Sequence, residues 1–477
     1  MKISKEKREQ FFRLFQEFIA SYPYTSEGLS NLKDYKKQRQ QIWRNFATII
    51  MSTETEIDIT EKIRLKFFLN LEMEVKPVIN FLRNCIQNPV KLSTEVEKIS
   101  GFPKFEQLDT ERLSLILNTF CPDEFLRINH ETLVGVNYFA DKGYNQQIKE
   151  YPAVNDTGIK LIQELSQEMH KSGVPALGEN DLFNLFCSWS KNKKYLTNPE
   201  YSLSKITVNT GFSEAELTAW LRSLERKKQI IFAGSPGTGK TYIAQNLAKY
   251  LIGGSYGFTQ LIQFHPAYSY EDFIQGIRPQ TRPDGNLNYP MIPGVFLEFC
   301  QKAEFCEDIC VLIIDEINRA NLAQVFGELM YLLEYREEKI PLAGSRELFS
   351  IPQNVRIIGT MNTSDRSIAL IDHAFRRRFA VIQIPPKYET LQQYHQKHTG
   401  FPVDNLIKIL KKINKTIDDP HYFLGISFFL TPLIEFELEG IWRMEIEPYL
   451  AEYFFAQPEQ LEQFRWEKIK DKLNENS

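Results

Sequence analysis

The sequence predicts a parallel α/β module with a helical lid in its C-terminal half, preceded by a mainly helical N-terminal domain. Three observations support this fold. Short apolar runs alternate with helical patterns after residue 212, a glycine-rich loop joins the first of these runs to a helix, and the N-terminal half shows helical periodicity. The five runs expected to form the parallel sheet are residues 229–233, 261–264, 309–314, 355–360 and 380–384.

Length and composition indicate a globular protein of two or three domains. The chain has 477 residues, of which 43% are hydrophobic and 25% charged, and these values exclude a disordered or fibrous chain. The net charge of −4 provides no general attraction to nucleic acid, so contact with DNA would need a local basic patch.

The cysteines and the N-terminus indicate a cytoplasmic protein. The six cysteines form no CxxC pair, so neither a zinc site nor a disulfide framework is predicted. The N-terminus has no apolar signal core, and no apolar run is long enough to span a bilayer, so we expect no membrane association.

Helical periodicity and punctuation divide the chain into four parts. In the N-terminal half, apolar residues recur at helical spacing in residues 7–20, 32–50, 63–72, 78–86, 112–120 and 158–170. A polar stretch over 190–210 has little periodicity, and Ser213 with Glu216 predicts a capping box that opens the next helix. We therefore expect an N-terminal domain over 1–200, a linker over 201–212, an α/β subdomain over 213–385 and a helical lid over 386–477.

A phosphate-binding loop follows the first predicted strand. The pattern G-x-x-x-x-G-K-[ST] is matched by Gly234, Ser235, Pro236, Gly237, Thr238, Gly239, Lys240 and Thr241. In such a loop, backbone N–H groups surround the phosphates at a helix N-terminus, the lysine contacts the terminal phosphates and the threonine hydroxyl ligates Mg²⁺. The strand before the loop and the helix after it argue against a chance glycine-rich turn.

Two carboxylates and an amide are expected beside this loop. Asp315 and Glu316 follow a buried strand, where ligands bind in open α/β sheets. We expect Asp315 to hold Mg²⁺ through water and Glu316 to act as the general base for an attacking water. Asn362, just past the next strand along the chain, is expected to orient the same water.

An arginine triplet at 376–378 comes before the last predicted strand. Alone it would indicate a solvated basic turn. Since it follows a complete triphosphate site, and since ring-forming motors complete such a site with an arginine from a neighbouring subunit, we expect Arg377 and Arg378 to act in trans.

Four segments carry a resemblance to a known family, namely residues 264–279 (FHPAYSYEDFIQGIRP), 314–321 (IDEINRAN), 361–367 (MNTSDRS) and the arginine triplet. Together they resemble McrB, the GTP-hydrolysing AAA+ subunit of modification-dependent restriction systems. Ser364 stands where the family usually has alanine, and Leu424 to Phe429 replace a Gly-His-Ser-Tyr-Phe element of the lid, which removes a histidine that could act as a sensor.

The resemblance covers roughly the last 260 residues and has specific implications. It implies GTP rather than ATP as substrate with Mg²⁺ as cofactor, a homo-oligomeric ring of six subunits, and a separate McrC-like nuclease subunit. It also implies that the N-terminal domain recognises modified, methylated DNA, that Asn362 orients the water, and that Asp365 and Arg366 have a structural or coupling role.

Two other functions are compatible with part of the pattern. An ATP-driven remodelling chaperone of the MoxR type shares the string over 315–320, although residues 361–367 favour McrB. A nucleotide-gated DNA-binding module with negligible hydrolysis is disfavoured by Glu316 and by the arginine triplet.

The N-terminal half leaves its own role open. Asp58, Glu74 and Lys76 are too loosely spaced to predict a nuclease site, so cleavage is assigned to a partner. A mixture of basic and aromatic residues is compatible either with DNA binding or with an ordinary amphipathic helix. These residues are Lys33, Tyr35, Lys36, Lys37, Arg39, Trp43, Arg44 and Phe46.

Overall fold

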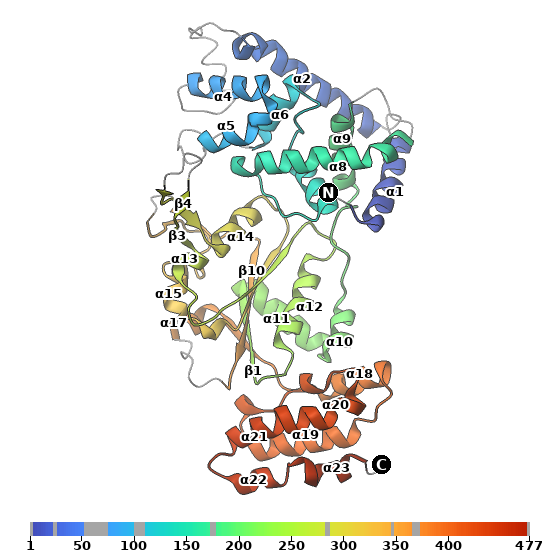
Figure 1. The fold of residues 1–477 in the computed structure, drawn as a ribbon, viewed down its shortest axis with the longest axis vertical. Helices are drawn as coiled ribbons and strands as arrows, with labels where there is room; N and C mark the ends of the chain where they lie inside the picture. The colour runs from blue at the N-terminus through green and yellow to red at the C-terminus, as the bar shows by residue number, and fades with distance from the viewer. Residues whose placement is uncertain are drawn as a thin grey trace. The chain divides into compact units, whose positions relative to one another are not determined.

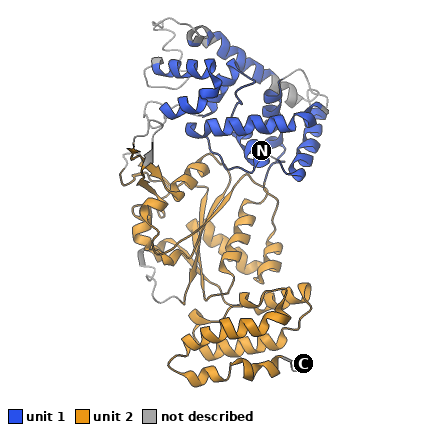
Figure 2. Ribbon diagram, viewed as in Figure 1, with its two compact units in different colours: residues 1–197 blue, residues 198–477 orange. Residues whose placement is uncertain are grey.

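The computed structural model forms two compact units, Met1–Thr197 and Asn198–Ser477 (Figure 2). It describes residues 3–21, 26–51, 75–99, 110–171, 178–281, 287–344, 348–364 and 373–474.

The described part of the first unit is helical. Its α-helices are α1 (Lys5–Ser21), α2 (Ser26–Met51), α4 (Val75–Gln87), α5 (Leu92–Ile99), α6 (Thr110–Phe120), α7 (His130–Ala140), α8 (Tyr151–Lys171) and α9 (Glu179–Asn192). Apolar side chains at spacings of three and four bury one face of α1, where the ring of Phe11 lies 4.9 Å from that of Phe186. The predicted helical N-terminal region is confirmed, whereas the predicted helix over 63–72 lies outside the described residues.

The expected linker over 201–212 is instead largely helical. Helix α10 (Leu203–Thr210) begins at Ser202, whose hydroxyl accepts a hydrogen bond from the N–H of Lys205, and ends at Gly211 with φ of 73°. Ile206 is fully buried against the second unit's core. The sequence did not indicate this helix, because a short helix with one large buried apolar residue shows almost no periodicity.

Five parallel strands form the central sheet of the second unit. They are β1 (Gln229–Gly234), β2 (Thr259–Gln263), β7 (Cys310–Asp315), β10 (Val355–Asn362) and β11 (Ala380–Gln383), in the order β11-β1-β10-β7-β2. The central strands β1 and β7 are buried along almost their whole length, while the edge strands β2 and β11 expose alternate residues. All five predicted strands are thus present.

Helices cover both faces of this sheet (Figure 1). One face carries α10, α11 (Glu214–Lys227) and α12 (Lys240–Ile252). The other carries α13 (Tyr270–Phe273), α14 (Val295–Glu304), α15 (Leu322–Phe326), α16 (Leu329–Leu332) and α17 (His373–Arg378). The predicted capping box of α11 forms, with reciprocal hydrogen bonds between Ser213 and Glu216. The predicted α/β fold class is confirmed.

The second unit also contains three small antiparallel strand pairs, which the sequence does not predict. They pair β3 (Gln275–Ile277) with β6 (Met291–Pro293), β4 (Gln280–Thr281) with β5 (Leu287–Asn288), and β8 (Ile340–Pro341) with β9 (Leu348–Phe349). Strands of two or three residues are too short to show an alternating pattern.

The lid is a helical bundle with a core of its own. It contains α18 (Tyr388–His398), α19 (Asp404–Ile417), α20 (Ile434–Ile441), a π-helical turn (Trp442–Ile446), α21 (Glu447–Tyr453), α22 (Pro458–Glu462) and α23 (Trp466–Asn474). Trp442 is fully buried at its centre, and its indole N–H donates to the carbonyl of Phe464 at 2.8 Å. In the described part of the chain, no helix combines the length and the apolar character that crossing a bilayer requires.

Replacing Trp442 is expected to destabilise the lid. Trp442→Ala removes a buried ring and its hydrogen bond, so the free energy of unfolding should fall by about 3–5 kcal/mol, measured by urea denaturation. Phe436→Ala is the control, since that ring is 83% exposed, and its effect should stay within about 0.5 kcal/mol. Equal effects of the two substitutions would contradict the described lid core.

Candidate nucleotide site

The glycine-rich loop lies between the end of β1 and the start of α12. Gly237 and Gly239 have φ values of 79° and 83°, which L-residues with side chains rarely adopt. A Cβ on Gly237 would lie 2.9 Å from the ring of Phe428. The glycines therefore give the loop its curvature and let the lid approach it, and the loop ends at the N-terminus of α12, which favours anions.

Hydroxyl and carboxylate oxygens gather where the loop meets the sheet. The hydroxyl of Thr241 donates to Oδ1 of Asp315 at 2.6 Å, and the hydroxyl of Thr360 donates to the same oxygen. Oxygen ligands of this kind suit Mg²⁺. The ammonium of Lys240 donates to the carbonyl of Ser235 at 2.8 Å, so it lies inside the loop. These residues fit a magnesium ion with a bound phosphate.

Glu316 leaves the line of β7 through an unusual backbone conformation. Its φ of 53° lies in the left-handed region, and its N–H donates to the hydroxyl of Thr360 at 3.2 Å. Such conformations cost about 1–3 kcal/mol and cluster at functional sites. Burial raises the pKa of the Glu316 carboxyl, an effect that the nearby Arg319 guanidinium opposes.

Both oxygens of the Glu316 carboxylate have partners. The amide of Asn362 donates to Oε1, and Nε of Arg319 donates to Oε2 at 3.3 Å. Asn362 is itself held, because its carbonyl accepts a hydrogen bond from the amide of Asn318 at 3.1 Å. The carboxylate and the amide are therefore fixed relative to each other.

The lid closes one side of the loop. The N–H of Ser427 donates to the carbonyl of Gly237 at 3.0 Å, and the hydroxyl of Thr363 donates to the carbonyl of His421 at 3.1 Å. A Cβ on Gly425 would lie 2.1 Å from the carbonyl carbon of Gly237, so only glycine fits there.

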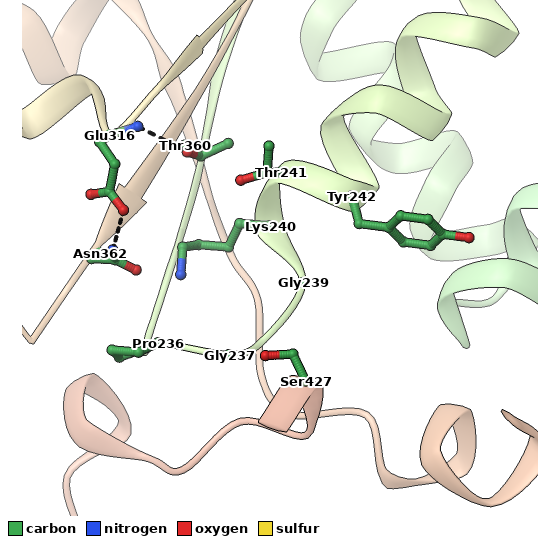
Figure 3. A pocket seen from close by; sticks show the side chains of 10 residues that line it. All are labelled: Pro236, Gly237, Gly239, Lys240, Thr241, Tyr242, Glu316, Thr360, Asn362 and Ser427. Atoms are coloured by element: carbon green, nitrogen blue, oxygen red, sulfur yellow. Dashed lines mark hydrogen bonds between the residues drawn. The ribbon is translucent and has the colours of Figure 1, made fainter. Parts of the chain in front are cut away.

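These groups surround one pocket of about 270 Å³ (Figure 3). The side chains of Lys240, Glu316 and Asn362 point into the same space, whereas Tyr242 points away from it. The residues that line the pocket are Pro236, Gly237, Gly239, Lys240, Thr241, Tyr242, Glu316, Thr360, Asn362 and Ser427.

The predicted trans arginines lie at the opposite end of the sheet from their own loop. They end α17, directly before β11, and β11 runs parallel to β1 with Ala380 opposite Ile230. Along β1, about 17 Å of extended chain separates this end from the glycine loop. Arg377 and Arg378 therefore cannot contact a phosphate held by their own loop.

Most of the remaining candidate residues either are outside the described residues or lie on helix α2. Asp365, Arg366, Asp58 and Glu74 lie outside the described residues. Of the basic and aromatic mixture on α2, Tyr35 is buried and Arg39 pairs with Asp181, while Trp43 is half-exposed and packs on Phe120. Lys33, Lys36, Lys37 and Arg44 are exposed.

Sequence reasoning missed three residues of the site, namely Thr360, Arg319 and Ser427. Thr360 could have been found, because it precedes Asn362 by two positions on one strand and so shares its face. Arg319 lies within the segment 314–321 but had no role assigned. Ser427 is positioned by the lid, and no local pattern indicates its place.

Comparison with known proteins identifies the same two regions. Residues 229–379 match the AAA domain of the dynein-related subfamily, and residues 405–462 match the alpha-helical lid domain of McrB.

Two curated relatives are restriction proteins. The chain is 39% identical to the type IV methyl-directed restriction enzyme EcoKMcrB subunit of Escherichia coli K12 over 284 residues, covering 54% of this chain and 61% of the relative. It is 29% identical to the type II restriction enzyme BsuMI component YdiS of Bacillus subtilis 168 over 215 residues, covering 37% of this chain and 60% of the relative. The match thus spans about three fifths of each relative. The C-terminal part of the chain therefore carries a McrB-like AAA domain, which belongs to the P-loop nucleoside triphosphatases, followed by a McrB lid domain.

Proposed function

We propose that this protein is a nucleoside triphosphate-hydrolysing motor subunit of a McrBC-like restriction complex. The observation that carries the proposal is the convergence of Lys240, Glu316 and Asn362 on one pocket beside Thr241 and Asp315. A site that only bound nucleotide would not need a half-buried carboxylate held by an amide.

The chain's own residues have separate tasks in this proposal. Lys240 and the loop N–H groups bind the phosphates, and Thr241 and Asp315 hold Mg²⁺, which neutralises phosphate charge when it is bound. Asn362 orients Glu316 and the attacking water, and Glu316 accepts the proton of that water. The lid excludes bulk solvent through Ser427.

The reaction needs a second copy of the chain. Because the arginines of one subunit are remote from its own loop, Arg377 or Arg378 is proposed to neutralise charge in the site of a neighbour. A closed ring, which we propose to be a hexamer, gives every site such a neighbour.

The substrate and partners are proposed from the relatives. We propose GTP as the preferred nucleotide, a McrC-like nuclease as the partner that cuts DNA, and recognition of methylated DNA by the N-terminal unit. The relatives' names, a methyl-directed restriction enzyme subunit and a restriction enzyme component, support a role in restriction of methylated DNA. GTP and the nuclease partner are proposed from the resemblance to McrB. An ATP-driven remodeller of the MoxR type is the second candidate, and the match to a McrB lid disfavours it.

Two substitutions separate binding from hydrolysis. Lys240→Ala should abolish hydrolysis and weaken nucleotide binding, because it removes the phosphate-binding cation. Glu316→Gln should leave binding intact and lower kcat by about 10²- to 10⁴-fold, because it removes the base. Phosphate release and fluorescent-nucleotide binding measure both, and hydrolysis at the wild-type rate in either variant contradicts the proposal.

Nucleotide preference and partner dependence test the restriction assignment. Hydrolysis of GTP and of ATP is compared with and without the product of the adjacent gene. We expect GTP to be preferred and the partner to stimulate hydrolysis. Preference for ATP together with the lack of a nuclease partner would favour the remodelling chaperone.

A further inference from the structure

A buried amide holds the arginine-bearing helix α17 at its C-terminal end. Gln229, the first residue of β1, is 1% exposed. Its Nε2 donates to the carbonyls of Arg378 and Leu333, each at 2.9 Å, and its Oε1 accepts from Arg336 at 2.9 Å. The ammonium of Lys227 donates to the carbonyl of Arg377 at 2.8 Å. Side chains from two other elements thus cap the last carbonyls of α17.

One carboxylate holds the side chains of the same two arginines. Oε2 of Glu334 lies 2.6 Å from Nη2 of Arg377 and 3.5 Å from Nη2 of Arg378. The exposed fraction of the side chain is 63% for Arg377 and 12% for Arg378. Arg377 therefore points outward beside the carboxylate, whereas the side chain of Arg378 lies mostly buried behind it.

The turn that bears Glu334 presents aromatic surface as well. Tyr331 and Tyr335 lie three residues before and one residue after it, on the same face of a helical turn. They are 45% and 47% exposed, and their rings lie 4.7 Å apart. Exposed tyrosines beside an arginine are typical of the residues that form protein interfaces.

We propose that Glu334 and Gln229 are positioning residues that aim Arg377 at the phosphate site of a neighbouring copy of this chain. Gln229 fixes the backbone from which the arginines project, and Glu334 fixes the direction of the Arg377 guanidinium. Arg378 supports this arrangement and does not reach the neighbour. The inference rests on the proposed function, since it specifies how that hydrolysis is completed in trans.

Substitution of Glu334 tests the inference. Glu334→Gln keeps the shape of the side chain and removes its charge, so the guanidinium loses its fixed direction. Hydrolysis should fall on the order of 10- to 100-fold, with nucleotide affinity and melting temperature unchanged. Glu338→Gln is the control on the same segment, because Glu338 is exposed, and it should match the wild type. Arg377→Ala should lower hydrolysis alone, whereas Arg378→Ala should also lower the melting temperature.

Mixed rings distinguish aiming in trans from a local structural role. A Lys240→Ala subunit cannot hydrolyse nucleotide in its own site, but its arginines are intact. Mixing it with Glu334→Gln subunits should therefore restore hydrolysis in the site of each Glu334→Gln subunit that receives Arg377 from a Lys240→Ala neighbour. The same addition should rescue Arg377→Ala and should not rescue Glu316→Gln.

The outcomes separate this inference from the proposed function. If the wild type hydrolyses no nucleotide, the proposed function itself fails. If the wild type hydrolyses nucleotide and Glu334→Gln hydrolyses it at the same rate, only the role of Glu334 is overturned. The same conclusion follows if Lys240→Ala subunits restore the activity of Arg377→Ala subunits but not that of Glu334→Gln subunits.

Discussion

The parallel register of β1, β10 and β7 is the constraint on which the candidate site depends. Gly234 lies opposite Asn362, and Ile314 lies opposite Gly359 across the next pair of strands. Because parallel strands end at the same edge, this register brings the loop, the two acids and the amide to one place without any long side chain. A shift of one residue would turn Thr360 and Asn362 to the other face of the sheet.

The same strand that ends in the phosphate loop begins at the arginine anchor. Gln229 opens β1 and Gly234 closes it, so one buried strand of six residues joins the two functional ends of the subunit. This arrangement suits a ring, because each subunit then presents its loop at one end of the sheet and its arginine at the other. Next to the arginines, the ring of Phe375 stacks on that of Phe379 with centroids 4.4 Å apart, and both rings are buried in the core on one face of the sheet.

Much of the fold and of the site could be predicted from the sequence, for identifiable reasons. The five strands are apolar runs between helices, and the loop that ends in Lys240 is a local pattern, so neither needs tertiary information. Asp315, Glu316 and Asn362 could be predicted because each lies at or directly after the C-terminal end of a strand. The role of Ser427 depends on a contact between segments distant in sequence. Arg319 pairs with Glu316 only three residues before it, but that spacing alone assigns no role. Helix α10 is too short to show its amphipathic pattern. Glu334 carries no sequence signal, because an acid on a charged turn is usually solvated.

The central claim is that hydrolysis depends on assembly of the subunits. The most direct test measures specific activity as a function of protein concentration and follows the mass of the oligomer in parallel. The account predicts that activity per subunit rises steeply as rings form, because an isolated subunit lacks the neighbour's Arg377. Activity per subunit that stays constant while the rings dissociate would contradict it.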